Sequence, residues 1–557
     1  MSLPIFSTQA ELFSTAGLSG QLFAPTDRYR LFALTVYPVL AQTRSQLEEA
    51  YCSDNGRVAV EPVLLLGVSL LQYLEGIPDR QAVELVRYHA GWNFALNRQV
   101  GDEVFHPTTL VNFRQRLLDH DLSPLAFETV LEALIQAGLV ARRGRQRLDS
   151  TQMFGRVSRM SRLDCVRETL RLTLQELAEQ LSPAQRPAWW SQTWEHYVET
   201  QTDYRASLET LARKMAEAGV AAQQVLHWLA QAPDPKWAAG KQAQLLARVF
   251  AEQFEVVAAE AAPQSKAKEQ LGSERLQNPH DPDATYASKG KGEQRKEHVG
   301  YKVQVAETVS EAVLRAGEPT RNFLTGMVTH PARESDEEGA LKMEAEQKDM
   351  GLDKPSVQYV DAAYISAQKL WEAQAEGREL IGPAPGPANN NDSRFTSQAF
   401  QVTVERREAV CPAGHPNSQC SRLEEQATGR VSYRFEWDTA TCTACALRQA
   451  CLKATHAHRS LVVGQHHTLL QARRQEQKTP SFKERMRHRN AIEGTQSELV
   501  RAHGLRRARY RGLAKVKLQN YFIGAACNLK RWLRRLAWEL QNASLKANLS
   551  GAPATAS

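Results

Sequence analysis

Residues 145–157 read RQRLDSTQMFGRV, and this stretch carries the first strand that the sequence predicts for an α/β domain. It is short and places Ser and Thr directly after Asp149, so we expect a strand that presents this carboxylate at its tip. Two more strands are expected downstream. GYKVQVAETV (300–309) alternates cleanly between polar and apolar side chains, and FLTGMVTH (323–330) has the composition of its partner.

Helix and strand alternate in the segments that follow. ESDEEGALKMEAEQKDMG (334–351) predicts a helix with acids in its first turn, where the helix dipole favours them. SVQYVDAAY (356–364) predicts a strand with Asp361 near its end, ISAQKLWEAQAEG (365–377) a helix, and RELIGPAP (378–385) a short strand. Strand tips are where such sheets place ligand-binding groups. With its inserts removed, this order predicts a three-layer α/β domain of ribonuclease H type.

Short helices separated by tight turns are expected before this domain. Pro62 opens the run PVLLLGVSLLQYLE and Gly76 closes it, which is the usual asymmetry of Pro near a helix start and Gly after its end. Further helical runs cover 77–96 and 108–120. The pattern is typical of a helix-turn-helix bundle that binds DNA or dimerises. A plain helical bundle that docks other domains is the alternative, and both stay open.

Two inserts interrupt the α/β order. In the first, leucines spaced by four, three and four residues from Leu170 to Leu181 mark one face of a helix. The second is rich in Gly, Pro and Asn at first, then β-like, and it contains most of the cysteines. The expected organisation is an all-α, helix-turn-helix-like N-terminal domain (1–140), a ribonuclease H-like domain in three pieces (141–162, 274–384 and 466–541), a helical insert with a linker (163–273), a β/Cys-rich insert (385–465) and a disordered tail (542–557).

Basic residues gather near the end of the chain. The net charge is only +7, but the segment from Arg501 to Arg535 holds eleven Lys and Arg and no Asp or Glu. Such a block suits a polyanion, because each neutralised phosphate releases counterions. A solvated helix face is the simpler interpretation of a short charge run, but the length of this one favours nucleic acid.

Targeting signals and membrane spans are not expected. The start, MSLPIFSTQAELF, lacks a basic segment followed by a long apolar one, so no signal peptide is predicted. No run of 18 apolar residues occurs, so no membrane span is predicted, and we expect a cytoplasmic protein. Five of the eight cysteines fall between positions 411 and 451, which favours reduced thiols and a metal over a disulfide framework.

One CxxC motif lies within this cysteine cluster. Four thiolates could serve one tetrahedral, structural Zn²⁺: Cys411, Cys442, Cys445 and Cys451. His415 or Cys420 is an alternative fourth ligand, and a set of reduced, unligated thiols is the alternative to zinc. A redox role is not expected, because no thioredoxin-like βαβ context surrounds the motif.

Three acids fit the needs of phosphodiester chemistry. Two divalent cations about 3.5–4 Å apart can activate a nucleophile and stabilise the leaving oxygen. Mg²⁺ prefers oxygen ligands, so carboxylates on rigid elements suffice to hold it. Asp149 and Asp361 stand at predicted strand ends, and Glu493 lies in the helical stretch KERMRHRNAIEGTQSELVR (483–501). Taken singly, each acid could be an ordinary solvated side chain, and Glu493 a counter-ion to the bases around it.

Five blocks, in a fixed order, carry a resemblance to a known family. They are VEPVLLLGVSLLQYLEGIPDRQAVELVRY with HPTTLVNFRQRL; RLDSTQMFG; HDPDATYASKGKG with HVGYKVQVAET; YVDAAYIS; and FKERMRHRNAIEGTQSEL with HGLRRARYRGLAKVKLQ and AACNLKR. Together they resemble the insertion-sequence DDE transposases of prokaryotes, in the subgroup with a helical N-terminal domain and a large helical insert. Each block alone is weak, but five in the right order make the resemblance specific.

The resemblance implies roles for the acids and for one base. Asp149, Asp361 and Glu493 would be catalytic and bind two Mg²⁺ or Mn²⁺ ions. Arg489, one helical turn before Glu493, would hold a phosphate near the cut strand through its bidentate fork.

Two positions depart from the family pattern Tyr-x-x-Arg-x-x-x-Glu. Met486 stands at the Tyr position, and the Lys expected seven residues after the Glu is Val500, followed by Arg501. The roles of that Tyr and Lys are therefore not transferred. Four bases could replace them in DNA binding as a group: Arg507, Arg509, Arg511 and Lys515.

Other acids near these blocks are assigned different roles. Asp281 and Asp283 are interpreted as turn-formers, because Pro282 fixes a bend between them. Glu498 is five residues past Glu493 and so about 140° around the helix, which predicts that it points elsewhere.

The function implied by the resemblance is excision and integration of a mobile element by hydrolysis and transesterification, without a covalent protein–DNA intermediate. The expected partners are double-stranded DNA with terminal inverted repeats, target DNA and a second copy of the chain, at the nucleoid of a prokaryote. The alternatives are a ribonuclease H-like metal-dependent nuclease without strand transfer and a non-enzymatic DNA-binding protein derived from a transposase. Three retained acids argue against the last.

Overall fold

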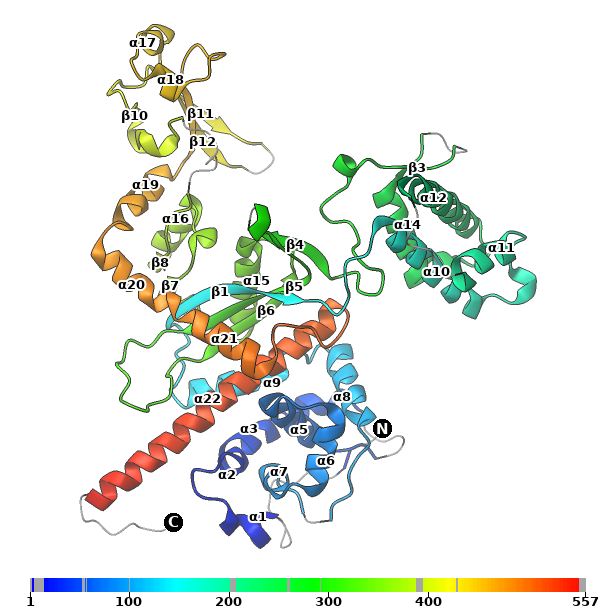
Figure 1. Ribbon diagram of the computed structural model, residues 1–557. Coiled ribbons are helices and arrows are strands. Elements are labelled where there is room, and N and C mark those ends of the chain that lie inside the picture. Colours follow the sequence, from blue (N-terminus) through cyan, green and yellow to red (C-terminus); the bar gives the residue numbers. More distant parts are fainter. Residues whose placement is uncertain are drawn as a thin grey trace.

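A mixed six-stranded sheet lies at the centre of the molecule, with helices around it (Figure 1). The computed structural model describes residues 3–4, 15–52, 56, 58–99, 101–200, 207–257, 261–290, 292–386, 394–426 and 429–549. The strands of the sheet are β1 (Arg145–Phe154), β4 (Thr285–Lys289), β5 (Lys296–Thr308), β6 (Leu324–Pro331), β7 (Val357–Tyr359) and β8 (Glu379–Ile381). The helices nearest to it are α15 (Asp336–Asp349), α16 (Ala367–Ala375), α20 (Pro480–Asn490), α21 (Ile492–His503) and α22 (Leu513–Leu549).

Strand β5 organises this sheet because it pairs along both of its edges. One edge pairs antiparallel with β1, and the other pairs with β4 and then with β6. Beyond β1 the pairing becomes parallel, first to β7 and then to β8. A Cβ added at Gly300 would collide with the backbone at Met153 and Gly155, so only glycine allows β5 to approach β1 this closely.

The two faces of the sheet bury different cores. Leu148 and Ala306 face a cluster that includes residues of α15 and α16. Met153 and Val305 belong to a larger cluster that includes residues of α22 and of the N-terminal helices. The expected mixed α/β architecture with helices on both faces is therefore present, and period-two alternation along β1 and β5 decides which core each residue joins.

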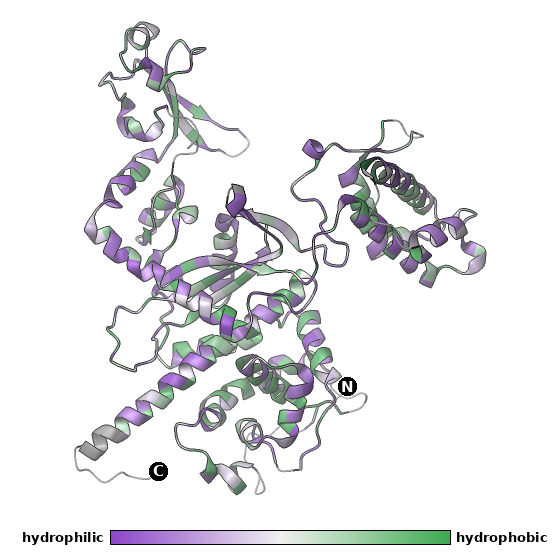
Figure 2. Cartoon of the chain, viewed as in Figure 1, coloured by the Kyte–Doolittle hydropathy of each residue, from purple (hydrophilic) through white to green (hydrophobic). Residues whose placement is uncertain are grey.

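The N-terminal helices share a core with the sheet. Helix α5 (Pro62–Glu75) begins at Pro62 and is capped by Gly76, whose φ of 70° lies in the left-handed region that glycine favours, as the sequence predicts. Figure 2 shows α5 as mostly hydrophobic, and twelve of its residues are buried. Its Tyr73 ring stacks on Phe522 of α22 with centroids 5.2 Å apart. These helices thus form a bundle that docks on α22, and contact with DNA stays a prediction.

Both inserts have cores of their own. The first packs α10 (Arg162–Gln180), α12 (Leu208–Ala230) and α14 (Lys241–Gln253) around the predicted leucine face, and Figure 1 shows it set apart from the sheet. The second builds a sheet from β11 (Gln419–Glu424), β12 (Val431–Glu436) and β13 (Ser460–Gly464) around Phe435 and Trp437.

Two expectations are corrected. Asp149 is the fifth of ten residues in β1 and not its tip, because the pairing with β5 carries the strand on to Phe154. Helix α22 extends to Leu549, eight residues into the segment predicted to be a disordered tail, because Ala, Leu and Lys in this segment favour helix. The rest of that segment, 550–557, lies outside the described residues. Among the described residues, none of the helices combines the length and apolar character that a membrane span requires.

Candidate active site

The parallel pairing of β1 and β7 brings two of the predicted acids together. Arg147 of β1 is the register partner of Tyr359, the last residue of β7. Asp149 and Asp361 each come two residues further along these parallel strands, so their backbones leave the pairing side by side. The parallel register of β1 and β7 therefore brings together two acids that are far apart in sequence.

Helices α20 and α21 supply an arginine and the third acid, respectively. Arg489 is in the last turn of α20 and Glu493 in the first turn of α21, with only Ala491 between the two helices. The Arg489 Nη2 atom lies 2.9 Å from Asp149 Oδ2 and 3.8 Å from Asp361 Oδ2. Its Nη1 atom lies 3.8 Å from Glu493 Oε1. All three predicted acids thus surround one guanidinium.

The three carboxylates differ in exposure. The side chain of Asp149 is 12% exposed, that of Asp361 41% and that of Glu493 73%. Burial raises the pKa of the Asp149 carboxyl, as does nearby Asp361, whereas Arg489 and the Ser150 amide oppose this shift. Exposure therefore increases from Asp149 in the sheet, through Asp361, to Glu493 on α21, so the site is open on the side of α21.

Each aspartate has one oxygen fixed by the backbone. The Ser150 amide donates to Asp149 Oδ1 at 2.8 Å, and the Ala363 amide donates to Asp361 Oδ1 at 2.8 Å. The other oxygen of each is the one that faces Arg489. Both carboxylates are thus oriented toward a common centre before any ligand arrives, which reduces the reorganisation that binding requires.

The donor set fits divalent cations that prefer oxygen. Three carboxylates around one guanidinium leave excess negative charge. The two aspartate oxygens face the same Nη2 atom and so lie within about 7 Å of each other, a span that two cations about 3.5–4 Å apart could bridge. The ligand atoms of Asp149, Asp361 and Glu493 are not all within 4.8 Å of one another, so the three are spaced too widely to enclose a single ion. Among the described residues, the one group of three that meets this distance is Glu498, His503 and Cys527.

That tighter group is a poor cation site. Glu498 already pairs with Lys530 at 2.9 Å and with Arg531 at 2.9 Å, so a divalent ion there would face two fixed positive charges. The prediction that Glu498 points away from Glu493 is confirmed by these contacts.

A fourth acid near the site was missed by sequence reasoning. Asp336, the first residue of α15, pairs with Lys302 at 3.2 Å. It also raises the pKa of Asp149. Burial alone would raise the pKa of Asp336, but Lys302 and hydrogen bonds from Ser150 and Gln304 lower it overall. Its position in SDEE is fully explained by the helix dipole, so the sequence held no further signal.

The departures from the family pattern have structural explanations. Met486 packs with Tyr359 and Phe482 in a small apolar cluster, where a thioether needs no hydrogen-bond partner. Val500 packs against the large core, and the Arg501 side chain beside it is exposed.

The predicted DNA-binding residues follow α21, in the connection to α22 and in the first turn of α22. Arg507, Arg511 and Lys515 are exposed, as phosphate contact requires. Arg509 differs, because its guanidinium lies over the Tyr73 ring, 4.8 Å from the centroid, which ties it to α5. The carboxylates of Asp281 and Asp283 accept hydrogen bonds from the backbone amides of Gly512 and Leu513, respectively. These two acids therefore fix the start of α22 as well as their own turn.

The cysteine cluster assembles at one end of the second insert. All eight cysteines lie in described residues and are free thiols. Cys411, Cys442 and Cys451 pack against the core of this insert. Burial raises the pKa of the Cys451 thiol, Arg459 opposes this shift, and Cys442, Cys411 and Cys445 add to it. Four neighbouring thiols fit the chemistry of a structural Zn²⁺, although no three of these sulfurs lie within 4.8 Å of one another.

Comparisons with known families agree with this architecture. Residues 410–533 match the family model described as "Transposase DDE domain", and residues 20–116 match the one described as "Transposase domain (DUF772)". The two matches support an insertion-sequence DDE transposase and confirm the resemblance found in the sequence. A search of curated proteins found no match. The first match contains Glu493 and Arg489, whereas Asp149 and Asp361 precede it.

Proposed function

We propose that this transposase cleaves and joins the ends of a mobile element by two-metal hydrolysis and transesterification. Asp149, Asp361 and Glu493 would hold two Mg²⁺ or Mn²⁺ ions. One observation carries the proposal: three acids from separate parts of the chain lie within 4 Å of the Arg489 guanidinium. An ordinary solvated acid would have no reason to share this centre with two others.

The sheet supports a ribonuclease H-like catalytic domain. Three antiparallel strands, β6, β5 and β1, continue into two parallel ones, β7 and β8. Asp149 and Asp361 lie where the pairing changes from antiparallel to parallel. Both the helical and the cysteine-containing segments leave the sheet as insertions, which supports the proposed division at 163–273 and 385–465.

Each residue of the site would have a distinct task. When bound, the cations would activate water or a 3′-hydroxyl and stabilise the leaving oxygen. Asp149 and Asp361 would provide cation ligands whose orientation is already fixed by backbone amides. Glu493, the most exposed of the three, would complete the cradle from α21. Arg489 donates one hydrogen bond to Asp149, and its fork has further N–H groups with which to hold a phosphate oxygen.

The proposed partners are duplex DNA with terminal inverted repeats, target DNA and a second copy of the chain. The exposed side chains of Arg507 and Arg511, between α21 and α22, and of Lys515, in the first turn of α22, would contact DNA phosphates. The zinc proposal concerns the second insert alone and assigns it a structural role.

An assay can test the active site directly. Duplexes covering the DNA on either side of the protein's own gene would be incubated with the full chain and Mg²⁺, with nicked and joined products separated on a gel. Changes to outer-shell partners alone cost about 10–100-fold, so Asp149→Asn should lose at least about 100-fold in cleavage. Asp353→Asn, at an exposed aspartate outside the site, is the matched control.

Different outcomes separate the candidate functions. Cleavage and joining by the wild-type protein, both lost in Asp149→Asn, support the transposase mechanism. Cleavage without joining favours the metal-dependent nuclease. Full cleavage by Asp149→Asn would show that the site is wrong.

A further inference from the structure

A buried acid breaks the pattern of the longest strand in the sheet. Along β5 the residues facing the large core are Tyr301, Val303, Val305 and then Glu307. The Glu307 side chain is 1% exposed, in a position where the alternation calls for an apolar residue. A buried charge is costly unless it is paired and hydrogen-bonded, so the contacts of this carboxylate should reveal its role.

Glu307 is tied first to β1. It is the register partner of Arg147, whose Nε atom donates to Glu307 Oε2 at 2.6 Å. The same guanidinium reaches a second element, because Arg147 Nη1 donates to the carbonyl of His488 in α20 at 3.0 Å. Arg147 is 5% exposed, so this link between strand and helix is shielded from water.

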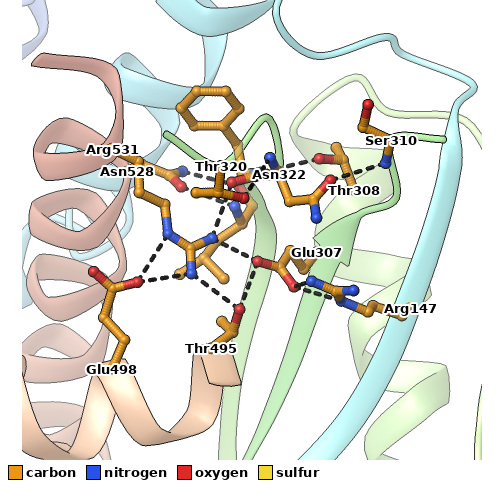
Figure 3. A network of polar contacts seen from close by, with 12 residues as sticks. Arg147, Glu307, Thr308, Ser310, Thr320, Asn322, Thr495, Glu498, Asn528 and Arg531 are labelled. Atoms are coloured by element: carbon orange, nitrogen blue, oxygen red, sulfur yellow. Dashed lines mark hydrogen bonds and ion pairs between the residues drawn. The ribbon is translucent and has the colours of Figure 1, made fainter. Parts of the chain in front are cut away.

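The other oxygen of Glu307 is tied to α21 and α22 (Figure 3). Thr495 of α21 donates to Glu307 Oε1 at 2.7 Å. Arg531 of α22 donates to the same oxygen at 2.5 Å and to Thr495 Oγ1 at 2.9 Å. Arg531 also binds Glu498 of α21 and the carbonyl of Asn322, so its fork holds the helix against the end of the sheet.

These contacts fall next to the active-site residues in sequence. Arg147 is two residues before Asp149, His488 is one before Arg489, and Thr495 is two after Glu493. A single carboxylate is therefore linked to β1 and α21 directly, and to α20 through Arg147. Hydrogen bonds in so dry an environment are stiff and strengthen one another.

We propose that Glu307, with Arg147, Thr495 and Arg531, is a positioning network that sets the spacing of Asp149, Arg489 and Glu493 for cation and phosphate binding. The inference rests on the proposed function of that site. None of the four touches the site's centre, so each acts through a neighbouring residue and none is catalytic.

Thr495→Val tests the network with little disturbance of packing. The substitution keeps the shape of the side chain and all the buried ion pairs, and removes only the hydroxyl between α21 and Glu307. Thr495→Ser keeps the hydroxyl and is the rescue variant. Thr173→Val is the matched control: Thr173 is also buried in a helix with a bonded hydroxyl, but it belongs to the first insert.

Mn²⁺ binding to the full chain, followed by the loss of the free-ion electron paramagnetic resonance signal, is the main readout. We expect Thr495→Val to need about tenfold more Mn²⁺ for half-saturation, the lower end of the effect of losing an outer-shell partner. Thr495→Ser should bind like the wild type. Thr173→Val should lower the melting temperature without moving the Mn²⁺ midpoint. Mg²⁺-dependent cleavage of the duplexes described above should shift in parallel.

A second variant covers the case of misfolding. Arg147→Lys keeps the charge beside Glu307 but lacks the fork that also reaches the His488 carbonyl, and it should weaken Mn²⁺ binding to a similar extent. If Asp149→Asn abolishes Mn²⁺ binding while Thr495→Val and Arg147→Lys bind like the wild type, the positioning network is refuted and the proposed function stands. If the wild type binds no better than Asp149→Asn, the proposed function fails and the network fails with it.

Discussion

Replacing Glu307 by Gln should destabilise the fold by an amount far beyond that of an ordinary surface acid. The change keeps the shape of the side chain but leaves Arg147 and Arg531, each 5% exposed, facing a neutral amide. Breaking a buried ion pair by removing one partner costs about 3–5 kcal/mol, because the remaining charge stays buried and uncompensated.

The contacts of the two arginines place the expected value within that range. Arg531 keeps Glu498 as a counter-charge at 2.9 Å, which limits the cost on that side. Arg147 keeps only the His488 carbonyl, a neutral acceptor. We therefore expect a loss near the middle of the range, about 4 kcal/mol. Urea unfolding of the full chain, followed by the fluorescence of its tryptophans and by far-ultraviolet circular dichroism, measures it.

Glu297 on the same strand offers a matched control. It too pairs with two arginines, Arg159 at 3.4 Å and Arg295 at 3.2 Å, but its side chain is 45% exposed. Surface pairs contribute little, so Glu297→Gln should leave the urea midpoint where it is. Equal midpoints for Glu307→Gln and Glu297→Gln would refute the argument that burial gives this network its strength.

Two further predictions concern other parts of the chain. Burial lowers the pKa of His503 to about 4 from its ordinary 6.5, so between these values the unfolded chain binds a proton that the folded chain does not. Stability should therefore fall as the pH is lowered from 6.5 to 4, by roughly 3 kcal/mol for this group. His503→Leu should reduce that pH dependence of the urea midpoint without abolishing it, because burial also lowers the pKa of His467 to about 4, and an unchanged slope would contradict the assignment. In the second insert, elemental analysis of purified protein should find about one zinc per chain, reduced in Cys442→Ser; well below one zinc in the wild type would reject the zinc site.

The strands could be predicted because their signals are local, whereas the grouping of the three acids was implied only by the family resemblance. Clean alternation identified β5, and Asp361 lies two residues after β7, close to its predicted place at the strand end. The error at Asp149 came from treating β1 as a short isolated strand. Its true length is set by pairing with β5, a partner some 150 residues away in sequence. Local patterns contain no information about such a partner.

The buried network illustrates a different limit. Glu307 was visible as an acid on the apolar face of an alternating strand, but its partner Arg531 lies in a helix that the sequence marks only as basic. A run of eleven bases suggests phosphate binding for all of them. The fold divides the run: Arg531 is buried as a structural counter-ion, and Arg507 and Arg511 remain exposed.

The hydrophilic character of α20 explains why charged groups are buried beside the active site. All residues of α20 are described, and Phe482 is the one among them whose side chain is buried. Apolar packing alone would therefore hold this helix only weakly against the sheet. Figure 2 shows the same helix as mostly hydrophilic. Its sequence PSFKERMRHRN is mostly charged and polar, so it has no wide apolar face to bury. Directional bonds from Arg147 to the His488 carbonyl and from Thr495 to Glu307 fix α20 and α21 in position instead. Apolar replacements often equal or exceed the stability of a buried ion network. The network is therefore better understood as a means of placing Arg489 and Glu493 over Asp149 than as a source of stability.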